Sequence, residues 1–267
     1  MKPLVESTRD DRSAQYSPDG RMIAFRTDRS GFSEIWLCDA EGRNPTQVTS
    51  FRGPLTGAPR WSPDGRQVAF DSRPQGNSDV FVVRVASGAV RRITRDAADD
   101  VVPSWSLDGN WIYFSSNRSG NWQIWKIRAG SGETADKAVQ VTQHGGFAAI
   151  ESSDGKTLYY AKGPDVSGLW QIPVAGGPEA PVLSELKSGY WGYWAPVNAS
   201  IYFIDTQEHN AAVYAYTPAT QQRVKVATLP KAPPFGDSGL SVSPDRRWLI
   251  YSQVDHAGSD IMLADLR

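Results

Sequence analysis

Three aspartates occupy one position in three copies of a repeated sequence unit, five residues before the last residue of the unit's first strand. They are Asp11, Asp100 and Asp237, and Asp10 and Asp99 directly precede two of them. If the units surround a common axis, these carboxylates face one another, and a cation relieves their repulsion. Oxygen ligands suit a hard ion, so the spacing predicts a site for Ca²⁺ or another divalent cation. The alternative is that these aspartates cap turns or pair with Arg12, Arg95 or other nearby arginines.

The three histidines fall in loops that strand alternation assigns to the same face as these aspartates. They are His144, His209 and His256. A histidine near carboxylates acts as a general base or a metal ligand, so all three are candidate catalytic residues. The alternative is that they are solvated loop residues with no chemical role.

An aromatic run enters the fifth repeat unit, and single phenylalanines enter the fourth and the sixth. Tyr190, Trp191, Phe147 and Phe235 are therefore expected to line a ligand pocket, with Arg12 as its basic residue. Aromatic walls with a few polar groups are typical of small-molecule sites. The alternative is that these rings pack between neighbouring units.

The elements that position these residues are set by an internal repeat. The tetrapeptide Ser-Pro-Asp-Gly occurs at Ser17–Gly20 and Ser62–Gly65, and four variants of it begin at residues 106, 152, 195 and 243. In this turn, proline presets the first turn angle, aspartate bonds the local backbone and glycine takes the position with positive φ. Six units of nearly constant length, each with several short strands, are typical of a β-propeller.

The pattern predicts an all-β fold, a six-bladed β-propeller of four-stranded antiparallel blades. Its blades start near residues 13, 58, 102, 148, 191 and 239. Residues 3–8 read as a fourth strand and residues 260–266 as a third, so the N-terminal strand is expected to complete the last blade. Residues 1–267 are then a single domain. The Pro-Asp-Gly turns share one face. The other face, which we call the top face, carries the irregular loops, where functional residues concentrate.

The repeat resembles that of TolB-like propellers. The resemblance rests on the nonapeptide Ser62–Phe70, on Asp28–Gly31 with Ile35 and Trp36, and on Asn117–Gly120 with Ile124 and Trp125. It is nearest to the C-terminal propellers of bacterial transmembrane winged-helix regulators. This resemblance implies a binding or sensing module that presents its top face or channel mouth to a small molecule or a protein.

Two functions remain open, and whether the chain is an enzyme is not decided. The alternative to a binding module is a metal-dependent hydrolase of lactones, aryl esters or phosphotriesters. It follows by analogy with six-bladed lactonases and organophosphate hydrolases that hold calcium at the channel mouth. A metal there polarises the substrate's oxygen and activates water.

Composition argues against nucleic-acid binding, a membrane span and an internal disulfide. The chain has 28 basic and 29 acidic residues, so it lacks the basic excess typical of nucleic-acid binding. No run of about 20 apolar residues predicts a membrane span. The single cysteine excludes an internal disulfide. We expect a monomer, in either the cytoplasm or the periplasm of a bacterium.

Overall fold

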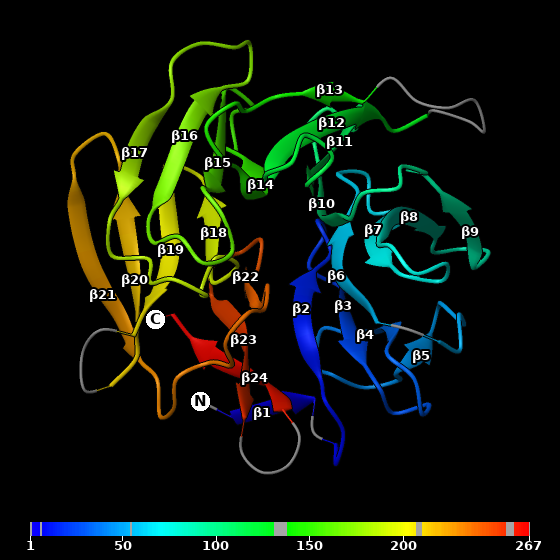
Figure 1. The fold of residues 1–267 in the computed structure, drawn as a ribbon. Helices are drawn as coiled ribbons and strands as arrows, with labels where there is room; N and C mark the ends of the chain where they lie inside the picture. The colour runs from blue at the N-terminus through cyan, green and yellow to red at the C-terminus, as the bar shows by residue number, and fades with distance from the viewer. Residues whose placement is uncertain are drawn as a thin grey trace.

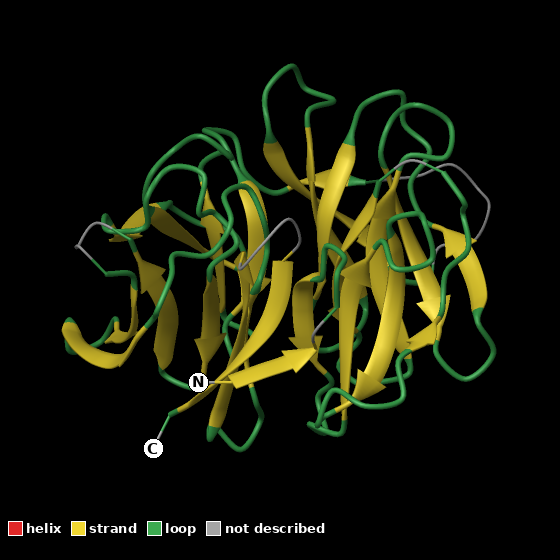
Figure 2. Ribbon diagram, turned by 90° about the horizontal axis from the view of Figure 1, so that it is seen from below, coloured by secondary structure: helices red, strands yellow, loops and turns green. Residues whose placement is uncertain are grey.

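The computed structural model describes residues 2–5, 7–53, 55–130, 138–206, 210–254 and 259–266. Their strands form six four-stranded antiparallel sheets arranged around a central axis (Figure 1). No helix occurs among the described residues (Figure 2), so none of them forms a helix able to cross a membrane. The predicted all-β, six-bladed propeller is confirmed.

The strands of the first three blades follow one another along the chain. Blade one contains β2 (Arg12–Tyr16), β3 (Met22–Thr27), β4 (Glu34–Asp39) and β5 (Thr46–Gln47). Blade two contains β6 (Thr56–Trp61), β7 (Gln67–Ser72), β8 (Asp79–Arg84) and β9 (Ala89–Arg92). Blade three contains β10 (Asp100–Trp105), β11 (Trp111–Ser116), β12 (Gln123–Arg128) and β13 (Val139–Gln140).

The next three blades repeat this order. Blade four contains β14 (Phe147–Glu151), β15 (Thr157–Ala161), β16 (Leu169–Pro173) and β17 (Ala180–Leu183). Blade five contains β18 (Trp194–Val197), β19 (Ser200–Asp205), β20 (Ala212–Thr217) and β21 (Gln222–Thr228). Blade six contains β22 (Leu240–Val242), β23 (Trp248–Val254), β24 (Ser259–Asp265) and the N-terminal β1 (Lys2–Val5).

The propeller is closed by its two chain ends, as the sequence predicts. The strand order in blade six is β1-β24-β23-β22, and Lys2 of β1 lies opposite Leu263 of β24. In Figure 1 the blue β1 lies beside the red β24. This pairing covers the outer edge of β24, which would otherwise present unpaired backbone groups.

The Pro-Asp-Gly turns are self-contained hydrogen-bonded units. Ser17 Oγ donates to Asp19 Oδ1 over 2.7 Å, and the backbone N–H of Arg21 donates to the same oxygen over 3.1 Å. These bonds hold the pKa of Asp19 below its usual value. Gly20 has a φ of 71°, which favours glycine. The aspartates of these turns therefore have a structural role.

Blade five departs from the repeat at its turn. Val197 pairs directly with Ser200, so a two-residue hairpin with Asn198 at a φ of 54° replaces the longer turn. The tetrapeptide that begins at residue 195 is therefore a repeat copy in sequence spacing only. Its inner strand consequently meets the channel in a different register.

The inner strands of blades one to four contain a β-bulge at one shared position. The bulged residues have positive φ although none is glycine: Ser13, Ala58, Val102 and Ala148. The inner-strand pairing is irregular at this position in all four blades, whereas β18 pairs with β19, and β22 with β23, in regular register over their described lengths. Bulges turn side chains out of the regular pleat, often beside functional sites.

Packing between blades holds the inner strands around the axis. The Trp61 indole donates to the backbone carbonyl of Gln15 in the preceding blade over 3.1 Å, and Trp105 donates likewise to Arg60. Their rings are buried with Val, Ile and Phe side chains of the outer strands. The repeated aromatic residue thus links each of these blades to the previous one.

Candidate functional site

The top face has a cavity of about 370 Å³ at the mouth of the central channel. Its walls come from the loops that enter the inner strands and from loops between second and third strands. We call this cavity the mouth. One side of it is aromatic and another is charged, and the bulged residues Ser13, Ala58 and Val102 lie between them. The mouth is therefore the place where the blades differ most from one another.

The aromatic wall is a chain of rings that crosses three blades. Trp122, Phe147 and Trp191 meet edge to face, with ring centroids 5.2 Å and 4.9 Å apart. Phe147 and Trp191 are almost fully buried, and their hydrophobic cluster includes Val102. Phe147 and Trp191 therefore do both things that the sequence left as alternatives: they line the pocket and they pack between blades.

Phe235 extends this wall at the rim and is 63% exposed. Its ring lies against Gly189, where an added Cβ would come within 1.7 Å of it. Gly236 N also donates to the carbonyl of Gly189 over 2.9 Å. Tyr190 packs against Phe235, at 6.0 Å between centroids, but lies behind the wall in the core rather than lining the mouth.

The charged wall contains Arg26, Asp71 and Arg73. Asp71 accepts the bulged N–H of Val102 over 3.1 Å. In blade three the equivalent position is Ser115, whose hydroxyl accepts the bulged N–H of Ala148 over 2.9 Å. A neutral hydrogen-bond acceptor is therefore sufficient for the scaffold at this position. The negative charge of Asp71 is not needed to hold the Val102 N–H.

Burial makes Asp71 an unusual acid. Loss of water raises its pKa to about 6, against the opposing effects of the Val102 N–H, Arg73 and Arg26. A perturbed carboxyl group in a cleft is a general mark of a functional site. Asp71 changes its charge near neutral pH, so the charge of the mouth changes there too.

Asp237 lies at the mouth and is only 6% exposed. Its Oδ1 accepts the Ser13 hydroxyl over 2.5 Å and the Ser238 N–H over 2.7 Å. Its Oδ2 is buried and has no hydrogen-bond partner among the described residues. Asp237 is thus held in place through Oδ1, and its Oδ2 can accept a further hydrogen bond.

The other predicted metal ligands are engaged by arginines, which corrects the expected ring of carboxylates. Asp11 receives two hydrogen bonds from Arg29, at 2.9 and 3.1 Å. Asp100 receives two from Arg118, at 2.9 and 2.7 Å. Both aspartates are fully buried. The alternative reading, that these aspartates pair with arginines, is the one the structure supports.

Asp10 and Asp99 also belong to the scaffold. Asp10 accepts from Arg12 and Arg26 at 2.6 and 3.0 Å, and Asp99 accepts the Ser78 N–H over 2.8 Å. Within the described ranges, no group of three or more His, Cys, Asp or Glu side chains is placed to hold a metal ion. Because arginines bond Asp10, Asp11 and Asp100, and the Ser78 N–H bonds Asp99, these four aspartates do not fit the predicted calcium-type site.

A difference in register explains why Asp237 escapes an arginine. Asp100 pairs with Ser116, and the bulge adds one residue between this pair and the turn. Blade six has regular pairing from Val242 to Leu240, so continuing this register places Ser238, rather than Asp237, in the position equivalent to Asp100. The sequence alignment is therefore out by one residue in blade six.

Of the three predicted histidines, His144 is the one within the described residues, and it does not line the mouth. His144 is exposed and lines a separate cleft of about 780 Å³ with Lys162, Trp170 and Glu179. That cleft shares no lining residue with the mouth. His209 and His256 lie outside the described residues. Arg12 is bonded to Asp10 and is not part of the mouth lining.

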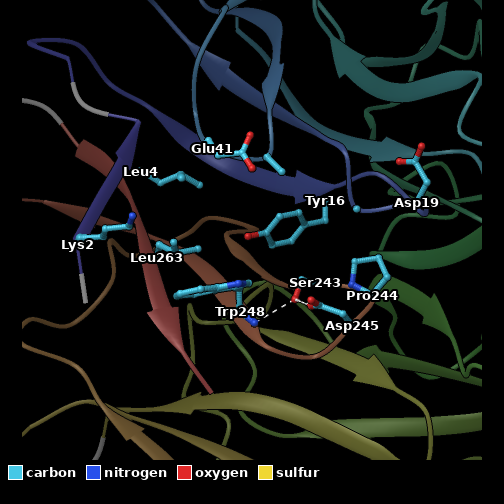
Figure 3. A pocket seen from close by; sticks show the side chains of 12 residues that line it. Lys2, Leu4, Tyr16, Asp19, Glu41, Ser243, Pro244, Asp245, Trp248 and Leu263 are labelled. Carbon is cyan, nitrogen blue, oxygen red and sulfur yellow. Dashed lines mark hydrogen bonds between the residues drawn. The ribbon is translucent and has the colours of Figure 1, made fainter. Parts of the chain in front are cut away.

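A third cavity lies at the seam between blades one and six, on the face of the Pro-Asp-Gly turns. It measures about 450 Å³, and Figure 3 shows Tyr16, Trp248 and Leu263 pointing into it. In blade three the tryptophan equivalent to Trp248 is Trp111, and Arg128 covers its ring at 4.1 Å. None of the predicted site residues lines the seam cavity.

Sequence reasoning missed several residues of the mouth, chiefly Arg26, Asp71, Arg73 and Trp122. Arg26 and Asp71 lie in the second strands β3 and β7, where the repeat pattern alone indicates scaffold. The available signal was the variation at their position, which holds arginine, aspartate and Ser115 in three successive blades. A position that is constant in secondary structure but variable in charge is a candidate for function.

The chain matches a family model described as the TolB beta propeller domain over residues 1–230. No curated protein matches the sequence. The similar solved structures include TolB from Acinetobacter baumannii, at 17% identity and a TM-score of 0.76. That match covers 93% of this chain and 62% of the TolB chain, so this chain spans less than two thirds of that protein.

Two further similar structures are enzymes. One is an oligogalacturonate lyase in complex with manganese, at 14% identity and a TM-score of 0.65, covering 97% of this chain and 90% of the lyase. The other is a puromycin-hydrolyzing peptidase from Mycobacterium tuberculosis, at 15% identity and a TM-score of 0.59, covering 96% and 45%. At these identities the likeness extends to the fold alone.

Proposed function

Since the chain belongs to the TolB beta propeller domain family, we propose that it is a binding module that holds a small molecule or a segment of a protein partner in the mouth. In a longer, regulator-like chain, such a module acts as the sensor domain. The observation that carries the proposal is the composition of the mouth. A wall of three aromatic rings shares one cavity with Arg26, Arg73 and the buried carboxylate of Asp71, and the scaffold needs only a neutral acceptor at position 71.

The mouth suits a ligand with an apolar part and a polar part. Aromatic rings bind apolar groups with a defined orientation, and a few convergent polar groups supply specificity. Phe235 adds an exposed ring at the rim, held in place by its close contact with Gly189. Arg26, Arg73 and Asp71 supply both signs of charge within the same cavity.

A titration with small neutral aromatic compounds tests this proposal. Indole, phenol and benzamide are followed by ligand-observed NMR with the wild type, Phe235→Ser and a control, Leu107→Ser. Leu107 is 50% exposed and lies in a turn on the opposite face. We expect Phe235→Ser to weaken binding about threefold to tenfold, because one ring contact is lost, and Leu107→Ser to leave it unchanged.

The same two positions test for a protein partner. A photo-crosslinking phenylalanine analogue placed at position 235 is expected to give a discrete adduct in the producing cell, and one placed at position 107 is not. Equal weakening of aromatic binding by both serine variants contradicts the proposal. So does the absence of both aromatic binding and a position-specific adduct.

A divalent-metal-dependent hydrolase is the second candidate, supported by the manganese in the similar lyase fold. In this chain the donor set is a poor match, because Asp11 and Asp100 are each bonded to an arginine. Among the predicted metal ligands that the structure describes, Asp237 at the mouth keeps a buried oxygen without a hydrogen-bond partner. This candidate therefore ranks below the binding module.

A further inference from the structure

Several buried polar side-chain atoms have no hydrogen-bond partner among the described residues, and Asp237 Oδ2 is one of them. Besides Asp237 Oδ2, they include Gln15 Nε2 and Tyr193 Oη, and none of these three atoms has a hydrogen-bond partner among the described residues. Their residues are 6%, 9% and 0% exposed. Buried polar groups are almost always hydrogen-bonded, so such a group is explained by an ordered water or a ligand.

Arg60 adds an uncompensated charge to this set. It lies on the inner strand β6, keeps partial access to solvent, and makes no side-chain hydrogen bond or ion pair within the described part of the chain. Loss of water lowers its pKa to about 10, and the negative charge of Asp237 opposes this effect. The charge of Asp237 therefore acts on Arg60, although no hydrogen bond or ion pair between the two is present among the described residues.

The scaffold does not require an arginine at position 60. The equivalent residues of blades three and six are Ser104 and Ser241. Ser104 Oγ donates to the Ala149 carbonyl over 2.6 Å, and Ser241 Oγ accepts the Tyr16 N–H over 3.1 Å. A small hydroxyl thus performs the structural task in these blades, and in blade two a guanidinium stands in its place.

The arginines of the scaffold behave differently. Arg29 and Arg118 each hold a buried aspartate and also lie over two aromatic rings. Arg223 is likewise bonded to Asp205 and lies over Phe203. Arg60 has neither arrangement in the described structure. A guanidinium enclosed without a carboxylate is a receptor for one, because its N–H groups match both oxygens of an acid.

We propose that the channel next to the mouth binds a carboxylate that carries an N–H or O–H donor beside it. The acid group is bound by Arg60, and the adjacent donor is accepted by Asp237 Oδ2. This inference rests on the proposed function, because the remainder of the ligand lies in the mouth against Trp191. The ligand class is an aromatic α-hydroxy or α-amino acid, either free or at the end of a larger molecule.

Three related probes test this assignment. They are 3-phenyllactate, 2-phenylethanol, which lacks its carboxylate, and 3-phenylpropionate, which lacks its hydroxyl. With the wild type we expect 3-phenyllactate to bind at least about tenfold more tightly than either analogue, since each lacks one charge-assisted hydrogen-bonding group. Arg60→Gln is expected to remove the preference over 2-phenylethanol, and Asp237→Asn the preference over 3-phenylpropionate. Arg21→Gln, an exposed arginine on the opposite face, is the control.

The ligand-free stability of Arg60→Gln gives a second readout. Removing a charge that is partly shielded from water and has no bonded counter-ion is expected to raise the melting temperature by about 2–4 °C. A fall would assign Arg60 to the scaffold and overturn the inference. Equal affinity for 3-phenyllactate and 2-phenylethanol would do the same and leave ordered water as the occupant. If neutral aromatic compounds still bind through Phe235 in that case, the proposed function stands without this inference.

Discussion

Asp11 and Asp100 on one side and Asp237 on the other are alike in sequence spacing and unlike in structure. The first two are fully buried, and each receives two hydrogen bonds from an arginine of the following loop. Asp237 is bonded through one oxygen to Ser13 and Ser238, and its second oxygen has no partner among the described residues. Blades one and three contain a bulged residue that has no counterpart in the pairing described for blade six, and the sequence of blade six has aspartate at position 255, where blades one and three have Arg29 and Arg118.

This difference shows how the repeat separates scaffold from site. Where blades one and three carry the same residues at equivalent positions, a buried aspartate is paired with an arginine, and the pair holds a loop in place. Where the blades disagree, at Arg60, Asp71 and Asp237, charge remains that the fold does not use. Uncompensated groups cost stability, so a protein that keeps them does so for a function.

The largest effect is expected for the scaffold pair of blade three. Arg118→Gln leaves the carboxylate of Asp100 buried without its cation, although burial already raises the pKa of that group. We expect a loss of about 3–5 kcal/mol in the free energy of unfolding, measured by urea denaturation. Arg43→Gln, at an exposed pair, is the control and is expected to change it by about 1 kcal/mol or less. Equal losses in the two variants would refute the scaffold role.

A smaller effect of opposite sign is expected at Asp71. Its folded pKa of about 6 lies above the unfolded value near 4, so the ionised form destabilises the fold above pH 6, and this cost disappears as the pH falls towards 4. Asp71→Asn should therefore raise the free energy of unfolding by about 2–3 kcal/mol at pH 8 and leave it unchanged at pH 4. Thermal melts across this pH range provide the measurement. A stability gain that does not depend on pH would contradict the assignment.

The smallest effect is expected for divalent cations. Because the arginines already engage Asp11 and Asp100, added Ca²⁺ or a chelator should shift the melting temperature by less than about 1 °C. Thermal melts of the wild type and Asp237→Asn check this. A rise of several degrees with Ca²⁺ that is lost in Asp237→Asn would restore the cation site.

The sequence predicts the architecture well, because the turns carry local chemistry. Ser17, Asp19 and Gly20 specify their turn through bonds among themselves, so every intact copy marks the boundary between two strands. The closure by β1 also follows from the pattern, since the last blade lacks a fourth strand without it. The degenerate copy in blade five fails because a two-residue hairpin satisfies the same spacing.

The candidate site is harder to predict because it depends on register and on neighbouring blades. A bulge at Val102 leaves no clear mark in the sequence, yet it shifts Asp100 by one position relative to Asp237. Arg60 and Asp71 lie within strands, where a pattern analysis expects scaffold. Phe147, Trp191 and Phe235, which the aromatic residues entering the blades predict as pocket lining, do line the mouth, and their role in binding stays a prediction.

The most direct test compares Asp100→Asn and Asp237→Asn side by side for stability and for affinity towards 3-phenyllactate. Our account predicts that Asp100→Asn loses more stability than Asp237→Asn. The Asp100→Asn molecules that remain folded are expected to bind 3-phenyllactate with the affinity of the wild type. Our account also predicts that Asp237→Asn keeps its stability and binds about tenfold more weakly. If Asp237→Asn loses as much stability as Asp100→Asn while its affinity is unchanged, the two aspartates have the same structural role and the account is wrong.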